Sequence, residues 1–240
     1  SVLALPLRNP VILAKELATL DYLSKGRLLP AIGLGQEDPK EYEACGIAKE
    51  GRGQRADEAI KVIRRLWQED NVTHEGQFFT LHNVSIVPKP IQKPSLPIWI
   101  GGRSKAAQHR VARLGDGWLA SQVTPQEIDQ GRQLIFDTAA ECGRTIDDDH
   151  IGTMLGFFIA PTAAAAFRVA EEHILRHRPD AHYKEYSALG PPKRVASLIR
   201  DYLAAGASKF VVRPMCASSE VQNQLELFGK EILPLFHGKD

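Results

Sequence analysis

The chain has 240 residues, of which 43% are hydrophobic, and its 30 Lys and Arg against 29 Asp and Glu leave a formal net charge of +1. This composition supports a sizeable core in one domain over 1–240, and the balanced charge argues against a nucleic-acid-binding arm or a polybasic membrane anchor. No apolar run approaches the ~20 residues of a membrane span and no signal peptide is visible, so we expect a cytoplasmic protein. The three cysteines are widely separated, which argues against a disulfide scaffold or a zinc site, so we expect no metal.

The first half of the chain alternates strand-like and helix-like segments. Residues 1–6 have the pattern of the second half of a strand, and Asn9-Pro10 predicts a helix that ends at Gly26. Residues 28–34 have the pattern of a buried strand, and a helix follows within about 54–69. A long inserted connection with short β-like pieces is expected over about 70–96.

The second half continues the alternation more regularly. It contains four strand patterns, at 97–100, 117–121, 151–160 and 209–212. Helices are expected at 104–114, 124–143, from 162, at 191–205 and at 218–235, with a loop over 177–190. Six strands separated by helices predict an α/β protein with a parallel sheet, and the pattern alone leaves a doubly wound sheet and a (β/α)8 barrel both open.

One glycine-rich turn has the chemistry of a phosphate site. Gly101, Gly102, Arg103 and Ser104 stand between a strand and a helix, where backbone N–H groups, a helix N-terminus and a cation come together. The alternative is an ordinary glycine turn with a capping serine and a solvated arginine.

Two other glycine segments follow or precede strands. Gly33-Leu-Gly35-Gln36 lacks the third glycine of a dinucleotide fingerprint, so it indicates either a loop beside an active site or a plain tight turn. Gly115-Asp-Gly-Trp118 reads as a structural turn that opens a strand.

Several segments together resemble the bacterial luciferase-like family of flavin-dependent oxidoreductases, including members that use the deazaflavin F420. The resemblance runs essentially from end to end of the chain. The matching segments are residues 1–10, 13–21, 24–27, 52–58, 87–90, 97–102 and 112–118.

The resemblance implies a (β/α)8 TIM barrel with the cofactor at the carboxyl ends of the strands. It places residue 1 in the middle of the third barrel strand, so about six of eight strands are expected here. We therefore expect a barrel that is incomplete at the N-terminus, with a gap between the strand at 1–6 and the strand at 209–213.

The resemblance also implies where the cofactor binds. It assigns a non-proline cis peptide behind the ring to Ser1-Val2, the polar edge of the ring to Gly33, Gly35 and Gln36, and the cofactor phosphate to Gly101, Gly102, Arg103 and Ser104. Arg213 is a further candidate contact, with a structural ion pair as its alternative. The catalytic histidine of several relatives comes from the early strands, so no catalytic acid or base is nominated.

The function implied is an oxidoreductase or monooxygenase that binds reduced FMN or coenzyme F420 and acts on a small-molecule substrate by hydride transfer or oxygen activation. Two alternatives stay open, a non-catalytic flavin-binding member of the family and another phosphate-binding α/β enzyme. We further expect a homodimer, because Ala14 and Ala18 on the helix over 10–25 permit close approach of a second helix.

Overall fold

The computed structural model describes residues 2–35, 38–174 and 178–236. The chain forms two compact units: the first holds residues 1–118 and 138–145, and the second holds residues 119–137 and 146–240. All of the cofactor-binding residues predicted from the sequence belong to the first unit, although Ser1 and Gln36 lie outside the described residues. The single domain over 1–240 stays a prediction.

The first unit is built on short parallel strands in the order β1-β2-β5-β6. They are β1 (Leu3–Ala4), β2 (Ala31–Gly33), β5 (Trp99–Gly101) and β6 (Gly117–Ser121), the last of which continues into the second unit. β1 pairs with β2 and β2 with β5 in parallel, so that Ala4, Gly33 and Gly101 end at one edge. This edge is where the predicted cofactor site lies.

The helices of the first unit begin and end at local signals. They are α1 (Pro10–Ser24), α2 (Pro39–Ala44), α3 (Arg52–Gln68) and α4 (Lys105–Leu114), with a 3-10 turn at Leu5–Leu7. The predicted caps of α1 are confirmed: the Asn9 side chain accepts from the backbone N–H of Val11 and Ile12, and Gly26 follows the helix at φ 78°.

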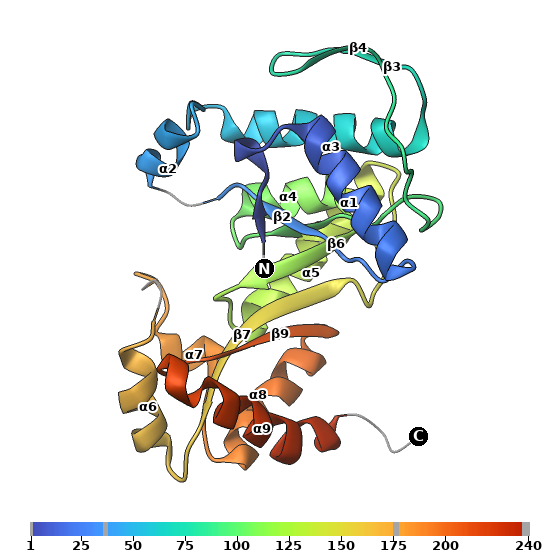
Figure 1. Cartoon of the computed structure of the whole chain (residues 1–240). Coiled ribbons are helices and arrows are strands. Elements are labelled where there is room, and N and C mark those ends of the chain that lie inside the picture. Colours follow the sequence, from blue (N-terminus) through green and yellow to red (C-terminus); the bar gives the residue numbers. More distant parts are fainter. Residues whose placement is uncertain (1, 36–37, 175–177, 237–240) are drawn as a thin grey trace. The chain divides into compact units, whose positions relative to one another are not determined.

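The inner face of α1 packs on α3, which runs beside it in Figure 1. Ala14 and Ala18 are fully buried, and the Trp67 indole N–H of α3 donates to the Ala14 carbonyl at 2.9 Å. The two alanines therefore pack within the unit and are not available to a second copy, and the homodimer stays a prediction.

The inserted connection forms an antiparallel hairpin of β3 (Val72–Glu75) and β4 (Thr80–Val84), in agreement with the predicted β-like pieces. Asn71 and Asn83 adopt left-handed backbone angles where the hairpin strands begin and end, a conformation that asparagine tolerates better than most residues.

The second unit is organised around one long strand, β7 (Ile151–Ile159). Residues 156–159 pair in parallel with β8 (Ser187–Gly190), and residues 152–157 pair in parallel with β9 (Lys209–Pro214). The helices of this unit are α5 (Pro125–Glu141), which ends in the first unit, α6 (Ala163–Glu171), α7 (Tyr183–Tyr186), α8 (Pro192–Ala204) and α9 (Val221–Glu231).

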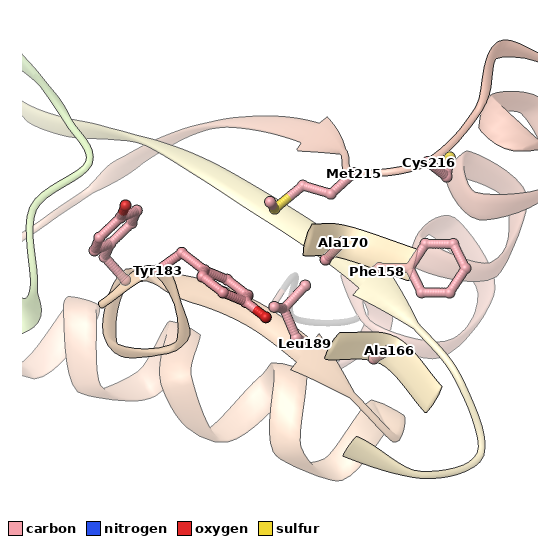
Figure 2. Close-up of a cluster of buried hydrophobic side chains, with 8 residues drawn as sticks. Phe158, Ala166, Ala170, Tyr183, Leu189, Met215 and Cys216 are labelled. Atoms are coloured by element: carbon pink, nitrogen blue, oxygen red, sulfur yellow. The ribbon is translucent and has the colours of Figure 1, made fainter. Parts of the chain in front are cut away.

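A buried apolar cluster fills the space between α6, α7 and the carboxyl ends of β7 and β8, as Figure 2 shows. Its members are Phe158, Ala166, Ala170, Tyr183, Tyr186, Leu189, Met215 and Cys216. Burial raises the pKa of the Cys216 thiol, so this thiol is a packing group rather than a reactive one.

The helix expected over 124–143 is confirmed as α5, and its start is a capping box. The Thr124 N–H donates to Glu127 Oε2 at 2.7 Å, and the Glu127 N–H donates to Thr124 Oγ1 at 3.3 Å. Arg178, whose side chain is 2% exposed, binds Glu127 through two hydrogen bonds and lowers the pKa of its carboxyl.

The six predicted strands are all present, and two expectations are corrected. The loop expected over 177–190 is wrong for residues 183–190, which form α7 and β8. β8 is Ser-Ala-Leu-Gly, which has neither β-branched nor aromatic residues, so pairing with β7 rather than propensity makes it a strand. The helix expected over 218–235 is interrupted, because Pro234 cannot continue it and the chain ends α9 with a 3-10 turn at Leu233–Leu235.

Candidate functional site

Three of the predicted site residues meet at the strand ends of the first unit. A Cβ added to Gly33 would lie 2.9 Å from Val2 Cγ1, and one added to Gly101 would lie 3.2 Å from the same atom. The Val2 isopropyl group therefore covers both glycines, and a larger residue at either position would displace it. The cis peptide implied for Ser1-Val2 involves Ser1, which is outside the described residues.

The turn from β5 into α4 requires its second glycine. Gly102 has φ 120°, and an added Cβ would lie 3.0 Å from the Ala107 Cβ. The Trp118 indole N–H donates to the Gly102 carbonyl at 2.6 Å, and the Ser104 hydroxyl accepts from the Ala107 N–H at 3.2 Å. The first turn of α4 is thus fixed at the position where the sequence predicts the phosphate.

Gly35 lies just beyond β2 in a conformation that favours glycine, with φ 81°. A Cβ there would lie 3.1 Å from Ala4 Cβ and 3.3 Å from the Tyr42 hydroxyl oxygen. Gln36, which follows it, is outside the described residues.

A cleft of about 480 Å³ opens beside the first turn of α4. Its walls carry three cationic side chains and one carboxylate, and we call it the cationic cleft. The lining residues are Leu34, Lys49, Glu50, Gly51, Arg52, Gly53, Ser104, Ala106 and Arg110. Among these described residues Ser104 alone belongs to the predicted set; Arg103 is exposed.

Arg110 is held at the cleft wall by an ion pair between two helices. Its guanidinium pairs with the Asp57 carboxylate of α3, and its side chain is only 11% exposed. A Cβ on Gly53 would lie 2.9 Å from Arg110 Nη2, so the absence of a side chain at Gly53 lets α3 approach this cation closely. α4 and α3 together therefore hold a positive charge at the cleft wall.

Sequence reasoning missed Arg110 and residues 49–53. Nothing in their spacing links an arginine in the second turn of α4 to a glycine at the start of α3. The available signal was Gly51-Arg52-Gly53, where two glycines flank a cation at the start of a helix.

The turn of the β3–β4 hairpin lies against the same part of α3. The Glu58 carboxylate accepts hydrogen bonds from the backbone N–H groups of Gln77, Phe78 and Phe79, and it contacts the His74 imidazole at 3.2 Å. Burial raises the pKa of Glu58, but the donors from Phe79, His74 and Phe78 outweigh it and lower the pKa below its ordinary value.

Phe78 and Arg55 connect this turn to the site. The Phe78 ring lies 3.4 Å from the position of a Cβ on Gly51, which lines the cationic cleft. Arg55 stacks over the Phe79 ring at 4.5 Å and donates to the Pro6 carbonyl, just beyond β1, at 3.0 Å. The inserted hairpin thereby supports both the cleft wall and the end of β1.

Two remaining candidates lie in the second unit. Arg213 donates to the His173 carbonyl at 3.3 Å, and burial lowers its pKa. Asp147, Asp149 and His150 place ligand-type atoms within 4.8 Å of one another, but the cluster is largely exposed and the Lys209 ammonium binds Asp149 at 2.9 Å. We assign neither a cofactor nor a metal to them.

The described helices include none that is both long and apolar enough to cross a bilayer.

Comparison with known proteins identifies the family of the chain that carries these strand-end glycines and the cationic cleft. The family model of luciferase-like monooxygenases matches residues 1–208. The chain belongs to the luciferase-like monooxygenase family, as the resemblance of its segments predicted.

Two relatives match most or about two thirds of the chain. An FMNH2-dependent dimethylsulfone monooxygenase of Pseudomonas fluorescens is 26% identical over 265 aligned positions, covering 95% of this chain and 70% of that protein. An uncharacterized protein of Mycobacterium tuberculosis is 32% identical over 160 residues, 66% of this chain; the matched part is 54%, about half, of that relative's length.

Solved structures share the fold. A monooxygenase from Streptomyces bottropensis has a TM-score of 0.81 at 22% identity, covering 99% of this chain and 77% of its own. An F420-dependent secondary alcohol dehydrogenase in complex with an F420-acetone adduct has a TM-score of 0.77 at 20% identity, covering 96% and 76%. The chain is thus an α/β protein that matches luciferase-like barrel enzymes over nearly its whole length.

Proposed function

We propose that this chain binds FMN or coenzyme F420 with the cofactor phosphate at the first turn of α4. The observation that carries the proposal is that Ser104, which caps α4, also lines a cleft with three cationic side chains. The first N–H groups of a helix have no acceptor within the helix, and the helix N-terminus carries partial positive charge. Together with Arg110, these groups supply the donors and the charge that a phosphate needs.

The carboxyl ends of β1, β2 and β5 would hold the ring of the cofactor. Val2 covers Gly33 and Gly101 with an apolar group, and no bulky side chain projects from either glycine. A flat ring can lie against this apolar surface, which Val2 forms because the two glycines have no side chain to displace it.

The bound cofactor would supply hydride transfer, or oxygen activation in the case of reduced FMN, and the chain would position it. Val2 and the two glycines orient the ring, and the α4 turn fixes the phosphate. The substrate we expect is a small organic molecule, and we assign no catalytic acid or base to a residue of this chain.

An absorbance spectrum of protein purified from its own host, followed by titration of the stripped protein with FMN and F420, tests the proposal. A flavin gives bands in the blue and near ultraviolet, and F420 gives a single violet band. Saturable binding of either cofactor supports the proposal, whereas binding of neither contradicts it and favours another phosphate-binding enzyme. Binding without turnover of any tested substrate would favour the non-catalytic member of the family.

We also propose that two copies of the chain associate through the outward face of α1. Three large apolar side chains on this helix are at least half exposed: Ile12 (59%), Leu20 (50%) and Leu23 (70%). Several large apolar side chains on the exposed face of one helix are typical of an interaction surface. Light scattering tests this: we expect a dimer for the wild type and a monomer for Leu23→Glu. A monomeric wild type would contradict it.

A further inference from the structure

The carboxylate of Glu58 joins the turn of the β3–β4 hairpin to α3. Its side chain is only 13% exposed and accepts hydrogen bonds from three successive backbone N–H groups, those of residues 77–79. A Cβ on Gly76 would overlap the Glu58 carboxylate, so the turn comes this close only because residue 76 is a glycine. Hydrogen bonds to an ionised acceptor are stronger than those to a neutral one. The turn is therefore held at one place on the second turn of α3.

The ring of Phe78 extends this contact to the start of α3. It lies 3.4 Å from the position of a Cβ on Gly51, the N-cap residue of α3, whose φ of 70° also favours glycine. Two residues further along, a Cβ on Gly53 would lie 2.9 Å from Arg110 Nη2. The start of α3 thus has the Phe78 ring against one glycine and the Arg110 guanidinium against the other.

This packing bears on the phosphate site of the proposed function. Gly51 and Gly53 line the cationic cleft together with Ser104 and Arg110. If the turn separated from Glu58, the Phe78 ring would leave Gly51, and the start of α3 would lose the group that packs on it. A phosphate would then have to order the wall beside Arg110 as it binds, and ordering costs affinity.

The adjacent aromatic residue of the same turn contacts a different place. Arg55 lies 4.5 Å from the centre of the Phe79 ring and 5.9 Å from that of Phe78, and it donates to the Pro6 carbonyl just beyond β1. Phe79 is therefore connected to the strand ends proposed for the ring of the cofactor, and Phe78 to the cleft. Substitutions of the two rings separate these connections.

We propose that Glu58 is a positioning residue for the cofactor phosphate and acts through the Phe78 ring on the start of α3. The inference rests on the proposed function and deepens it, because it assigns control of phosphate affinity to the inserted hairpin. The coupling is reciprocal. If the closed turn favours binding of the phosphate, the bound phosphate stabilises the closed turn to the same extent.

Titrations with FMN and riboflavin, which differ in the phosphate, test this role. The variants are Glu58→Gln, which places an amide NH2 group against the N–H donors of the turn, and Phe78→Leu. The matched controls are Phe79→Leu, which alters the adjacent ring, and Glu75→Gln, which removes an exposed carboxylate from the same hairpin. We expect the two variants to lower the ratio of FMN affinity to riboflavin affinity about fivefold, at the lower end for coupling between sites, and the controls to keep the wild-type ratio. If the wild type binds F420 instead, F420 and its phosphate-free deazaflavin chromophore form the equivalent pair.

Hydrogen exchange gives a second readout. Saturating the wild type with FMN should raise the protection factors of the amides of residues 77–79, and it should raise them less in Phe78→Leu. Phe78→Leu leaves Glu58 and the backbone donors in place, so it also serves if Glu58→Gln does not fold.

Two results would overturn the positioning role and leave the proposed function intact. One is an unchanged ratio of FMN to riboflavin affinity in both variants, and the other is an equal loss of affinity for the two ligands. Failure of the wild type to bind FMN and F420 would overturn the proposed function and this inference with it.

Discussion

The two units of the chain use their strands in different ways. In the first unit β1, β2 and β5 have two or three residues each, end in or beside glycine, and leave open space lined by cations. In the second unit β7 has nine residues, seven of them buried, and pairs along its length with β8 and β9. The short strands of the first unit end beside a cleft that is suited to binding, whereas the long apolar strand of the second unit supplies stability. Mutations should therefore separate the two properties.

The largest effect should come from the core of the second unit. Phe157 of β7 is fully buried, and its ring centre lies 4.6 Å from that of Phe228 in α9. Phe157→Ala removes this packing and leaves a cavity, so we expect the free energy of unfolding to fall by about 3–5 kcal/mol. Urea denaturation measures it, with Val211→Ala on β9, where the side chain is 39% exposed, as the control. A loss as small as that of the control would contradict the role given to β7.

The next largest effect should be on binding in the first unit. Arg110→Gln removes a cation that is 11% exposed at the cleft wall, and we expect cofactor affinity to fall by roughly ten- to hundredfold, about 1.5–3 kcal/mol. The midpoint of urea denaturation should change less than in Phe157→Ala. Unchanged affinity for FMN and F420 would remove Arg110 from the site.

The hydrogen bonds from the turn of the β3–β4 hairpin to Glu58, which we call the hairpin clamp, should make the stability of the first unit depend on pH. Because the pKa of Glu58 is lower in the folded chain than its ordinary value of about 4.3, its stabilisation is present above that value and is lost as the pH falls through the folded pKa. The protection factors of the Gln77, Phe78 and Phe79 amides against hydrogen exchange, which correct for the intrinsic rate at each pH, should fall in acid. In Glu58→Gln these amides should exchange faster already at neutral pH, because the free energy of opening the hairpin turn falls by about 1–3 kcal/mol. Protection that is equal in both proteins at all pH values would exclude the clamp. His74, whose imidazole contacts the Glu58 carboxylate at 3.2 Å, is the second residue to replace in a control.

The smallest effect is expected at Arg103. Its side chain is exposed, so a contact with the cofactor phosphate would be screened by solvent and worth about 0–1 kcal/mol. Arg103→Ala should therefore weaken cofactor binding less than Arg110→Gln does, in the same titration. A larger loss for Arg103→Ala would reverse the ranking of the two cations.

Local signals predicted the parts of the fold that depend on neighbouring residues. Asn9 and Thr124 cap helices through bonds to residues two or three positions away, and such patterns are legible in any sequence. β8 was missed because its four residues become a strand only by pairing with β7.

The candidate site divides in the same way. Gly101, Gly102 and Ser104 were found because a strand-to-helix turn is a local feature, and Gly33 and Val2 came from the family resemblance. The cationic cleft was missed because Arg110 meets Asp57 and Gly53 only after α3 and α4 have packed together. Charged residues that meet only through tertiary packing are not separated by any characteristic number of residues in the sequence, so no motif predicts them.

The central claim is that the first turn of α4 and the cationic cleft bind the phosphate of a flavin-type cofactor. Its most direct test is the ratio of the dissociation constants for riboflavin and FMN, measured on the wild type and on Arg110→Gln under one salt condition. We predict that the wild type binds FMN at least about tenfold more tightly than riboflavin, as loss of one charge-assisted contact implies, and that Arg110→Gln narrows this difference. Equal affinities of the wild type for FMN and riboflavin would contradict the claim.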